Sequence, residues 1–319
     1  MIISRTPLRI SFVGGGTDMK YFYSQIPGSV ISIAINKYIY IIVKKRYDKE
    51  IVLNYSKREI VYSVSEIKHG IIKACLEMVG IKDSIEITSI ADIPSEGSGL
   101  GSSSTFTVGL LNALFQYIGK TVSQKELARL ACEIEIDICK APIGKQDQYG
   151  ASIGGLKKII FHSNGEVEIN KIPDENNLYK NLEDQLILVN SNIVRSASKV
   201  LEKQKINLSV NLERLKSFPN IVNKFEEDLY SQSFKNMYAQ LDNYWKEKKT
   251  LVKSAVKKDL ESIYDKHVPK NCYAGKICGA GGGGYFMFFK KENSKLDSEK
   301  YFNIKIDVSG SIIIYKKLA

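Results

Sequence analysis

The segment Pro94–Ser104, with the sequence PSEGSGLGSSS, constrains the fold of this chain most strongly, because it combines a flexible turn with an immediate helix start. Glycine recurs at alternate positions from 97 to 101, where it permits left-handed backbone angles and a close approach of the main chain to a bulky anion. We expect Ser102 or Ser103 to cap the helix that follows. The segment therefore predicts a loop that leads directly into the N-terminus of a helix.

The flanking residues predict a strand before this loop and an amphipathic helix after it. An apolar run from Ile85 to Ile90 is typical of a strand. Apolar residues at helical spacing follow the loop, namely Phe106, Leu110, Ala113, Leu114 and Tyr117. The first turn of such a helix directs unpaired N–H groups and about half a unit of positive charge at the loop. Phosphate binding is therefore expected here, and a simple linker would lack these flanks.

Two other glycine-rich phosphate motifs do not match the loop. The pattern Gly-x-x-x-x-Gly-Lys-Ser/Thr is absent, because no lysine lies inside the loop. A dinucleotide fingerprint needs Gly-x-Gly-x-x-Gly and an acid about 20 residues further on. Here the glycines alternate and position 121 is threonine, so the dinucleotide interpretation is weak.

The composition indicates a large globular chain. Its 319 residues are 44% apolar and 25% charged, enough for one large or two medium domains. Five scattered cysteines and three distant histidines indicate no disulfide framework, zinc site or serine–histidine pair. Without an 18-residue apolar run or a signal peptide, we expect a cytoplasmic protein with no membrane partner.

The net charge of +11 raises the question of nucleic-acid binding. The lysines, however, are dispersed among acids, and no arginine-rich stripe with stacking aromatics is present. A lysine-rich surface and anionic substrates explain the charge, so no nucleic-acid partner is expected.

A second glycine-rich turn, Gly14–Asp18, ends the N-terminal strand expected over residues 1–13. It presents the Asp18 carboxylate beside open backbone, which suits hydrogen bonding to the hydroxyls of a polyol. Alternatively, Asp18 caps the short helix expected from Met19 to Tyr23.

A helix expected over residues 124–139 carries three acids off its apolar face, Glu133, Glu135 and Asp137. Surface solvation explains them, but one such carboxylate with a hydroxyl and water is also enough to hold Mg²⁺ on a triphosphate.

The turn at residues 141–150 then holds a polar cluster that includes Lys145, Gln146 and Asp147. Asp147 is a candidate base, with Lys145 and Arg9 as candidates to hold it ionised. A solvated loop explains the cluster equally well.

The composition changes near residue 166, which predicts two domains, 1–165 and 166–319. Strands first, with helices packed on one side, predict an α+β fold. In the second domain a short strand, Leu186–Asn190, leads to Arg195 and Lys199, and helices are expected up to about residue 264.

A third glycine-rich loop, Lys276–Gly284, is followed by an apolar strand at Tyr285–Phe289. Its four consecutive glycines, which include Gly281 and Gly282, carry a cost in conformational entropy. Close approach of the backbone to a ligand is one reason to keep them.

Taken together, Arg5–Asp18, Pro94–Ser104 and Lys276–Gly284 resemble, in order, the three motifs of the GHMP kinase superfamily. The resemblance implies a two-domain α+β kinase, whose cleft between domains holds ATP and Mg²⁺ at the second motif. The family often carries Gly-Leu-Gly-Ser-Ser-Ala, and Ser104 stands here in place of the alanine. The first motif and residues 144–149 are similar to the sugar-1-kinase branch, and at this length most to kinases of D-glycero-D-manno-heptose 7-phosphate.

The resemblance also implies roles for individual residues. Asp147 matches the catalytic aspartate and Arg9 the arginine beside it. Ser103 and Glu135 match the hydroxyl and carboxylate that bind Mg²⁺, with Glu133 left open as the carboxylate. ATP would be bound by Pro94, Gly97, Ser98, Gly99, Leu100, Gly101, Ser102, Ser103 and Ser104. The sugar phosphate is expected to contact Gly14, Gly15, Gly16, Thr17, Asp18, Lys145, Gln146, Gly281 and Gly282. Its phosphate needs a basic clamp, and we expect Arg195 and Lys199 to form it because they lie just after the strand Leu186–Asn190.

The implied reaction is in-line phosphoryl transfer from ATP to the anomeric hydroxyl of the sugar phosphate. Three alternatives stay open: a kinase for another sugar, such as fucose or galactose; a non-catalytic regulator of the same fold that binds sugar and ATP; and, more remotely, an RNA-binding module. The sequence leaves the oligomeric state open, a homodimer included.

Overall fold

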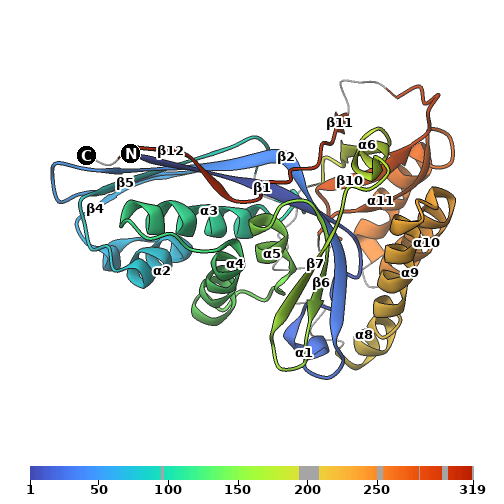
Figure 1. The fold of residues 1–319 in the computed structure, drawn as a ribbon, viewed down its shortest axis with the longest axis horizontal. Coiled ribbons are helices and arrows are strands. Elements are labelled where there is room, and N and C mark those ends of the chain that lie inside the picture. Colours follow the sequence, from blue (N-terminus) through green and yellow to red (C-terminus); the bar gives the residue numbers. More distant parts are fainter. Residues whose placement is uncertain (95–96, 194–207, 250–253, 280, 297–300, 318–319) are drawn as a thin grey trace.

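The computed structural model describes residues 1–319 except 95–96, 194–207, 250–253, 280, 297–300 and 318–319. Figure 1 shows a large sheet with helices on one side and, at the other end of the molecule, a smaller sheet with further helices. The expected α+β class is confirmed. In the part of the chain that the structure describes, no helix is both long enough and apolar enough to cross a membrane.

The larger sheet has eight strands within the described ranges. Their order is β12-β1-β2-β5-β3-β4, and the hairpin β6-β7 joins β2 through β6. The strands are β1 (Ile2–Val13), β2 (Gly28–Lys45), β3 (Ile51–Asn54), β4 (Arg58–Val61), β5 (Ile85–Ala91), β6 (Leu156–Phe161), β7 (Val167–Ile172) and β12 (Ile312–Lys316). The pair β3–β5 is parallel, and the other pairings are antiparallel.

Strand β2 organises this sheet, because its 18 residues pair with β1 on one edge and with two strands in succession on the other. Residues 28–33 pair with β6, and residues 39–45 pair with β5. The apolar runs 30–35 and 38–44, which the sequence separates by polar residues, thus belong to one strand. Register shifts in β1 between Pro7 and Leu8 and between Ser11 and Val13 flank Arg9, and such irregularities re-aim side chains near functional sites.

The helices α2, α3 and α4 cover one face of the larger sheet, and α1 lies beside the β6-β7 hairpin (Figure 1). The helices of this part are α1 (Lys20–Tyr23), α2 (Gly70–Val79), α3 (Ser102–Tyr117), α4 (Gln124–Cys132), α5 (Gln146–Ser152) and α6 (Leu178–Glu183), with a 3₁₀ turn at Val64–Glu66. The expectation of a single α-helix over 124–139 needs correction. Helix α4 ends at Cys132, and a π-helical turn, η2 (Glu133–Ile138), continues it.

The smaller sheet is antiparallel, in the order β11-β8-β10-β9, and α10 packs on it at β9. Its strands are β8 (Leu186–Asn190), β9 (Cys272–Ile277), β10 (Tyr285–Lys290) and β11 (Tyr301–Asn303). The accompanying helices are α8 (Leu208–Leu215), α9 (Phe218–Tyr230), α10 (Phe234–Lys248) and α11 (Ser254–His267). The helical character expected of this stretch is therefore observed.

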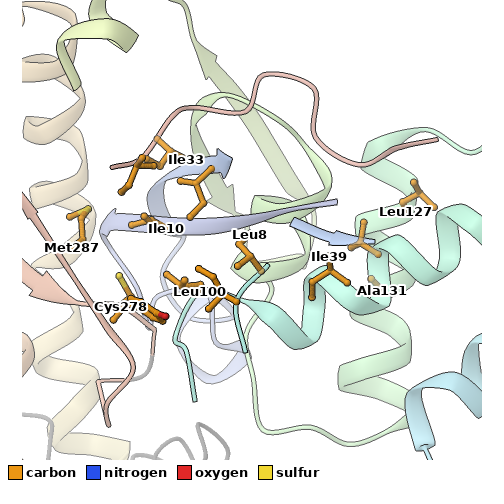
Figure 2. Close-up of a cluster of buried hydrophobic side chains, with 14 of the residues drawn as sticks. Leu8, Ile10, Ile33, Ile39, Leu100, Leu127, Ala131, Cys278 and Met287 are labelled. Atoms are coloured by element: carbon orange, nitrogen blue, oxygen red, sulfur yellow. The ribbon is translucent and has the colours of Figure 1, made fainter. Parts of the chain in front are cut away.

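One buried apolar cluster joins the two sheets at the glycine-rich loops. Figure 2 shows Leu100, which precedes α3, close to Cys278, with Ile10 of β1 and Met287 of β10 in the same cluster. Burial of these side chains fixes the position of both loops. The domain boundary at residue 165 stays a prediction; by hydrogen bonding, β7 and β12 belong to the larger sheet although they follow that boundary.

Candidate active site

Three consecutive residues at the start of α5 organise the site. Each contacts a different residue singled out in the sequence: Gln146 contacts Asp18, Asp147 contacts Arg9 and Gln148 contacts Glu135. The first turn of one short helix thus connects the N-terminal glycine turn, strand β1 and the π-helical turn η2. The polar cluster of residues 145–148 is therefore more than a solvated loop.

Arg9 and Asp147 form an ion pair in which both contacts use the same carboxylate oxygen. Arg9 Nε donates to Asp147 Oδ1 at 2.8 Å, and Arg9 Nη2 lies 2.6 Å from that oxygen. Arg9 Nη1 donates to the carbonyl oxygen of Gly99 at 2.8 Å. The Arg9 side chain is 3% exposed, whereas that of Asp147 is 28% exposed. The arginine therefore anchors Asp147 to the glycine-rich loop, and its hydrogen bond to Asp147 uses Oδ1 and not Oδ2.

Glu135 lies beside Ser103 at the N-terminus of α3. Ser103 Oγ donates to Glu135 Oε1 at 2.8 Å, and Gln148 Nε2 donates to Glu135 Oε2 at 2.7 Å. The glutamate is 1% exposed, and this burial raises its pKa, while hydrogen bonds from Ser104, Ser103 and Gln148 oppose the rise.

Of the two glutamates left open, it is Glu135 that contacts Ser103, whereas the partly exposed Glu133 pairs with Arg129. The π-helical turn has more residues per turn than an α-helix and so rotates the side chains that follow its start. Glu135 is buried on this turn, where the α-helical pattern had placed it off the apolar face.

Asp18 is buried and does not cap the helix that follows it. It accepts hydrogen bonds from the backbone N–H of Gly16 at 3.0 Å, from Gln146 Nε2 at 3.0 Å and from the Gln146 backbone N–H at 3.2 Å. Burial and, next, the charge of Asp147 raise the pKa of Asp18. Helix α1 has Met19 as its N-cap and no side-chain cap, so the capping alternative is wrong.

The glycines of the loop before α3 have the expected left-handed angles, with φ of 69° at Gly97, 74° at Gly99 and 78° at Gly101. Gly101 is itself the N-cap of α3, and no side chain caps the helix, so the expectation of a Ser102 or Ser103 cap is wrong. Ser98 and Ser102 instead bond to each other at 2.9 Å. Since their side chains leave the N–H groups of the first turn unused, the helix N-terminus can accept an anion.

The C-terminal glycine-rich loop packs directly on this loop. A methyl group added to Gly99 would lie 2.6 Å from the carbonyl oxygen of Cys278, and one added to Gly284 would lie 2.3 Å from that of Gly97. Contact between two backbones thus explains these glycines. Gly281 and Gly282 lie buried in the same loop, and their contact with a substrate stays a prediction.

Two other residues expected to bind substrate make contacts inside the protein. Lys145 Nζ donates to the carbonyl oxygen of Gly165 at 2.6 Å, in the β6-β7 turn. The Thr17 hydroxyl lies 2.8 Å from the carbonyl oxygen of Gly14 and fixes the glycine turn. Arg195 and Lys199 lie outside the described residues.

The sequence reasoning missed Gln148, Tyr244 and Lys248. On α10, buried residues recur at 237, 241, 244 and 248, so Lys248 continues the apolar face of the helix. The sequence signal for Lys248 was its spacing, because a helix that buries residues 237, 241 and 244 also buries position 248. Gln148 belongs to the polar cluster of the 141–150 turn, and that position was its signal, but no role was assigned to it.

The oxygen ligands at Ser103 and Glu135 fit a hard cation. One carboxylate and one hydroxyl, adjacent to a site for phosphates, is the set through which Mg²⁺ commonly binds together with nucleotide and water. The described residues contain no group of three or more His, Cys, Asp or Glu that could hold a metal ion by itself.

Comparisons with known proteins agree with this arrangement. The model of the GHMP kinase N-terminal domain matches residues 64–155. D-glycero-alpha-D-manno-heptose 7-phosphate kinase of Campylobacter jejuni is 31% identical over 320 residues, which cover 95% of this chain and 91% of that protein. The chain belongs to the GHMP kinase family. The expected enzyme class, a phosphotransferase with an alcohol group as acceptor and ATP as donor, is thereby confirmed.

Two further similarities agree with membership of the GHMP kinase family. L-fucokinase/L-fucose-1-P guanylyltransferase of Bacteroides fragilis is 26% identical over 333 residues, which cover 92% of this chain and 35% of that protein. The crystal structure of a D-glycero-D-manno-heptose 1-phosphate kinase from Bacteroides thetaiotaomicron aligns with a TM-score of 0.82 at 22% identity, covering all of both chains. That second likeness shows the shared fold.

Proposed function

We propose that the protein is a sugar-1-kinase that transfers the γ-phosphoryl group of ATP to the anomeric hydroxyl of D-glycero-D-manno-heptose 7-phosphate. The observation that carries the proposal is the first turn of α5, where Asp147 is held by Arg9 against the glycine-rich loop. The choice of sugar is supported by the similarity to the Campylobacter jejuni kinase. The 1,7-bisphosphate would feed the synthesis of nucleotide-activated heptose for surface polysaccharide.

In the proposed mechanism, the loop before α3 and the helix N-terminus bind the phosphates of ATP through backbone N–H groups. Ser103 and Glu135 would hold Mg²⁺, which supplies charge neutralisation to the phosphates when it is bound. Arg9 ties this loop to Asp147, because it donates to Gly99 and to Asp147 at once. The loop that binds ATP and the base Asp147 would therefore keep a fixed position relative to each other, which favours in-line attack.

Asp147 orients the anomeric hydroxyl and accepts its proton through Oδ2. Both arginine contacts go to Oδ1, so Oδ2 keeps its lone pairs for the sugar. An anomeric hydroxyl is more acidic than an ordinary alcohol, so a carboxylate is a sufficient base. On the other side of the α5 turn, the Asp18 carboxylate, which Gln146 holds in place, offers acceptor atoms to the remaining sugar hydroxyls.

The test is ADP release with Mg-ATP and a panel of sugars, each with and without a terminal phosphate. Turnover on heptose 7-phosphate that far exceeds turnover on fucose or galactose supports the proposal. Turnover confined to an unphosphorylated hexose contradicts the choice of sugar. ATP binding without turnover on any sugar favours the non-catalytic regulator.

A further inference from the structure

Three hydrogen-bond donors converge beside Gly15. A methyl group added to this glycine would lie 3.5 Å from Tyr244 Oη, 3.6 Å from Gln146 Nε2 and 3.7 Å from Lys248 Nζ. Tyr244 and Lys248 belong to α10, and Gln146 begins α5. Donors from both halves of the molecule therefore lie close to the Gly15 backbone, within reach of one shared acceptor.

Each nitrogen donor keeps a proton for a ligand. Lys248 Nζ donates to the carbonyl oxygen of Gly279 at 2.8 Å, which uses one of its three protons. Gln146 Nε2 uses one of its two protons for Asp18. The Tyr244 hydroxyl approaches the carbonyl oxygen of Gly15 at 3.4 Å, a long contact that a better acceptor can replace.

Two lysines withdrawn from water lie beside this site, and the Asp18 carboxylate contacts Gln146. Lys248 is 7% exposed and Lys276 is 1% exposed, and the Nζ atom of each lies 5.8 Å from the centroid of the Tyr244 ring. Burial lowers the pKa of Lys276 well below its ordinary value. Burial lowers the pKa of Lys248 to about 8, so loss of water is what disfavours its charged form here. A buried ammonium with a single carbonyl acceptor is costly, and an anion would compensate it.

We propose that Lys248, Gln146 and Tyr244 bind an oxygen of a phosphoryl group in van der Waals contact with the Cα of Gly15. The inference rests on the proposed function and deepens it, because it assigns residues that recognise a phosphate. The phosphate has two possible sources with the same oxygen chemistry: the one that the acceptor sugar already carries, or the one in transfer from ATP. Charge-assisted hydrogen bonds of this kind are about twice as strong as neutral ones.

Two substitutions test the site in different ways. Gly15→Ala places a methyl group between the Gly15 backbone and the three donors and so crowds a bound oxygen; it should fold normally because its contacts would be ordinary van der Waals distances and the backbone there is not left-handed. Lys248→Met removes the charge and keeps the length of the side chain. The matched controls are Gly70→Ala, an unstrained glycine elsewhere, and Lys157→Met, a buried lysine that bonds one carbonyl oxygen at 3.1 Å.

The measurements are calorimetric binding of heptose 7-phosphate and of unphosphorylated heptose without ATP, and steady-state kinetics with both sugars. If the acceptor's phosphate is bound here, both variants weaken binding of the phosphorylated sugar about 10- to 100-fold and leave the other sugar unchanged. If the group in transfer is bound here, kcat falls with both sugars and binding is unchanged. The controls should change neither.

Unchanged binding and unchanged kcat in both variants, at native melting temperature, would overturn the proposal. The proposal would also be overturned if the wild-type protein bound no sugar phosphate and both variants kept the wild-type kcat. Failure of the proposed function looks different: the wild-type protein would bind heptose 7-phosphate and transfer no phosphate to it, while the binding comparison would still report on Gly15 and Lys248.

Discussion

Asparagine at position 147 should remove the base and keep the contacts that hold it. Both nitrogens of Arg9 that contact Asp147 bond to Oδ1, at 2.8 Å and 2.6 Å, and an asparagine carbonyl can occupy that position. The amide group then replaces Oδ2, the oxygen assigned to proton transfer. We expect Asp147→Asn to fold, to bind ATP and sugar with nearly unchanged affinity, and to lose turnover.

The size of the loss follows from the role. A positioned general base contributes about 10²- to 10⁴-fold, or about 3–5 kcal/mol of activation free energy. Asp147→Ala should behave differently, because it also deprives buried Arg9 of its acceptor. Leaving that donor unsatisfied costs about 1–3 kcal/mol of stability, toward the lower end since the Asp147 side chain is 28% exposed.

The assay combines ADP release at saturating substrates with thermal melting of both variants. Asp147→Asn should lose activity at nearly native melting temperature, and Asp147→Ala should lose both. Wild-type kcat in Asp147→Asn would refute the assignment of the base. A large drop in its melting temperature would refute the argument that Oδ1 alone carries the structural contacts.

Three further substitutions have defined outcomes. Gln148→Met removes the donor to Glu135 Oε2 and should raise the Mg²⁺ concentration for half-maximal rate about 10- to 100-fold. Gly144→Ala would place a methyl group 2.0 Å from Asp18 Oδ2 and should raise KM for the sugar with KM for ATP unchanged. Lys157→Met should stabilise the protein by about 1–4 kcal/mol at neutral pH, measured by denaturant unfolding.

The Lys157 prediction has a defined pH dependence. Burial lowers the pKa of Lys157 from 10.5 to about 7, so between these values the folded state binds fewer protons than the unfolded chain. The free energy of unfolding of the wild-type protein should rise with pH through this window. The difference in free energy of unfolding between Lys157→Met and the wild type should therefore shrink. A stability difference between wild type and Lys157→Met that stays constant from pH 7 to pH 10 would contradict this prediction.

An unaltered Mg²⁺ requirement in Gln148→Met would contradict the role given to Gln148. An unaltered KM for the sugar in Gly144→Ala would contradict the role given to Asp18.

Local chemistry made much of the site predictable from the sequence. The alternating glycines at 97–101 require left-handed angles wherever they fold, and the apolar spacing after them allows little but a helix. The ion pair of Arg9 with Asp147 and the contact of Ser103 with Glu135 join residues more than 30 positions apart, and the family resemblance indicated those pairs.

The errors arose where tertiary contacts override local pattern. The π-helical turn at 133–138 cannot be told from an α-helix by apolar spacing, so the burial of Glu135 was not foreseen. The contact of the Lys145 ammonium with the β6-β7 turn was likewise not foreseen, and its contact with a substrate stays a prediction. Lys248 was overlooked because a single lysine in a lysine-rich helical stretch looks exposed until the face of α10 that packs on the smaller sheet is known.

The position of the transferred phosphate tests the central claim most directly. After incubation of heptose 7-phosphate with Mg-ATP, phosphorus and proton NMR of the purified product should show a second phosphate whose phosphorus couples to the anomeric proton. A product phosphorylated on another hydroxyl, or unmodified sugar with ATP intact, would contradict the account.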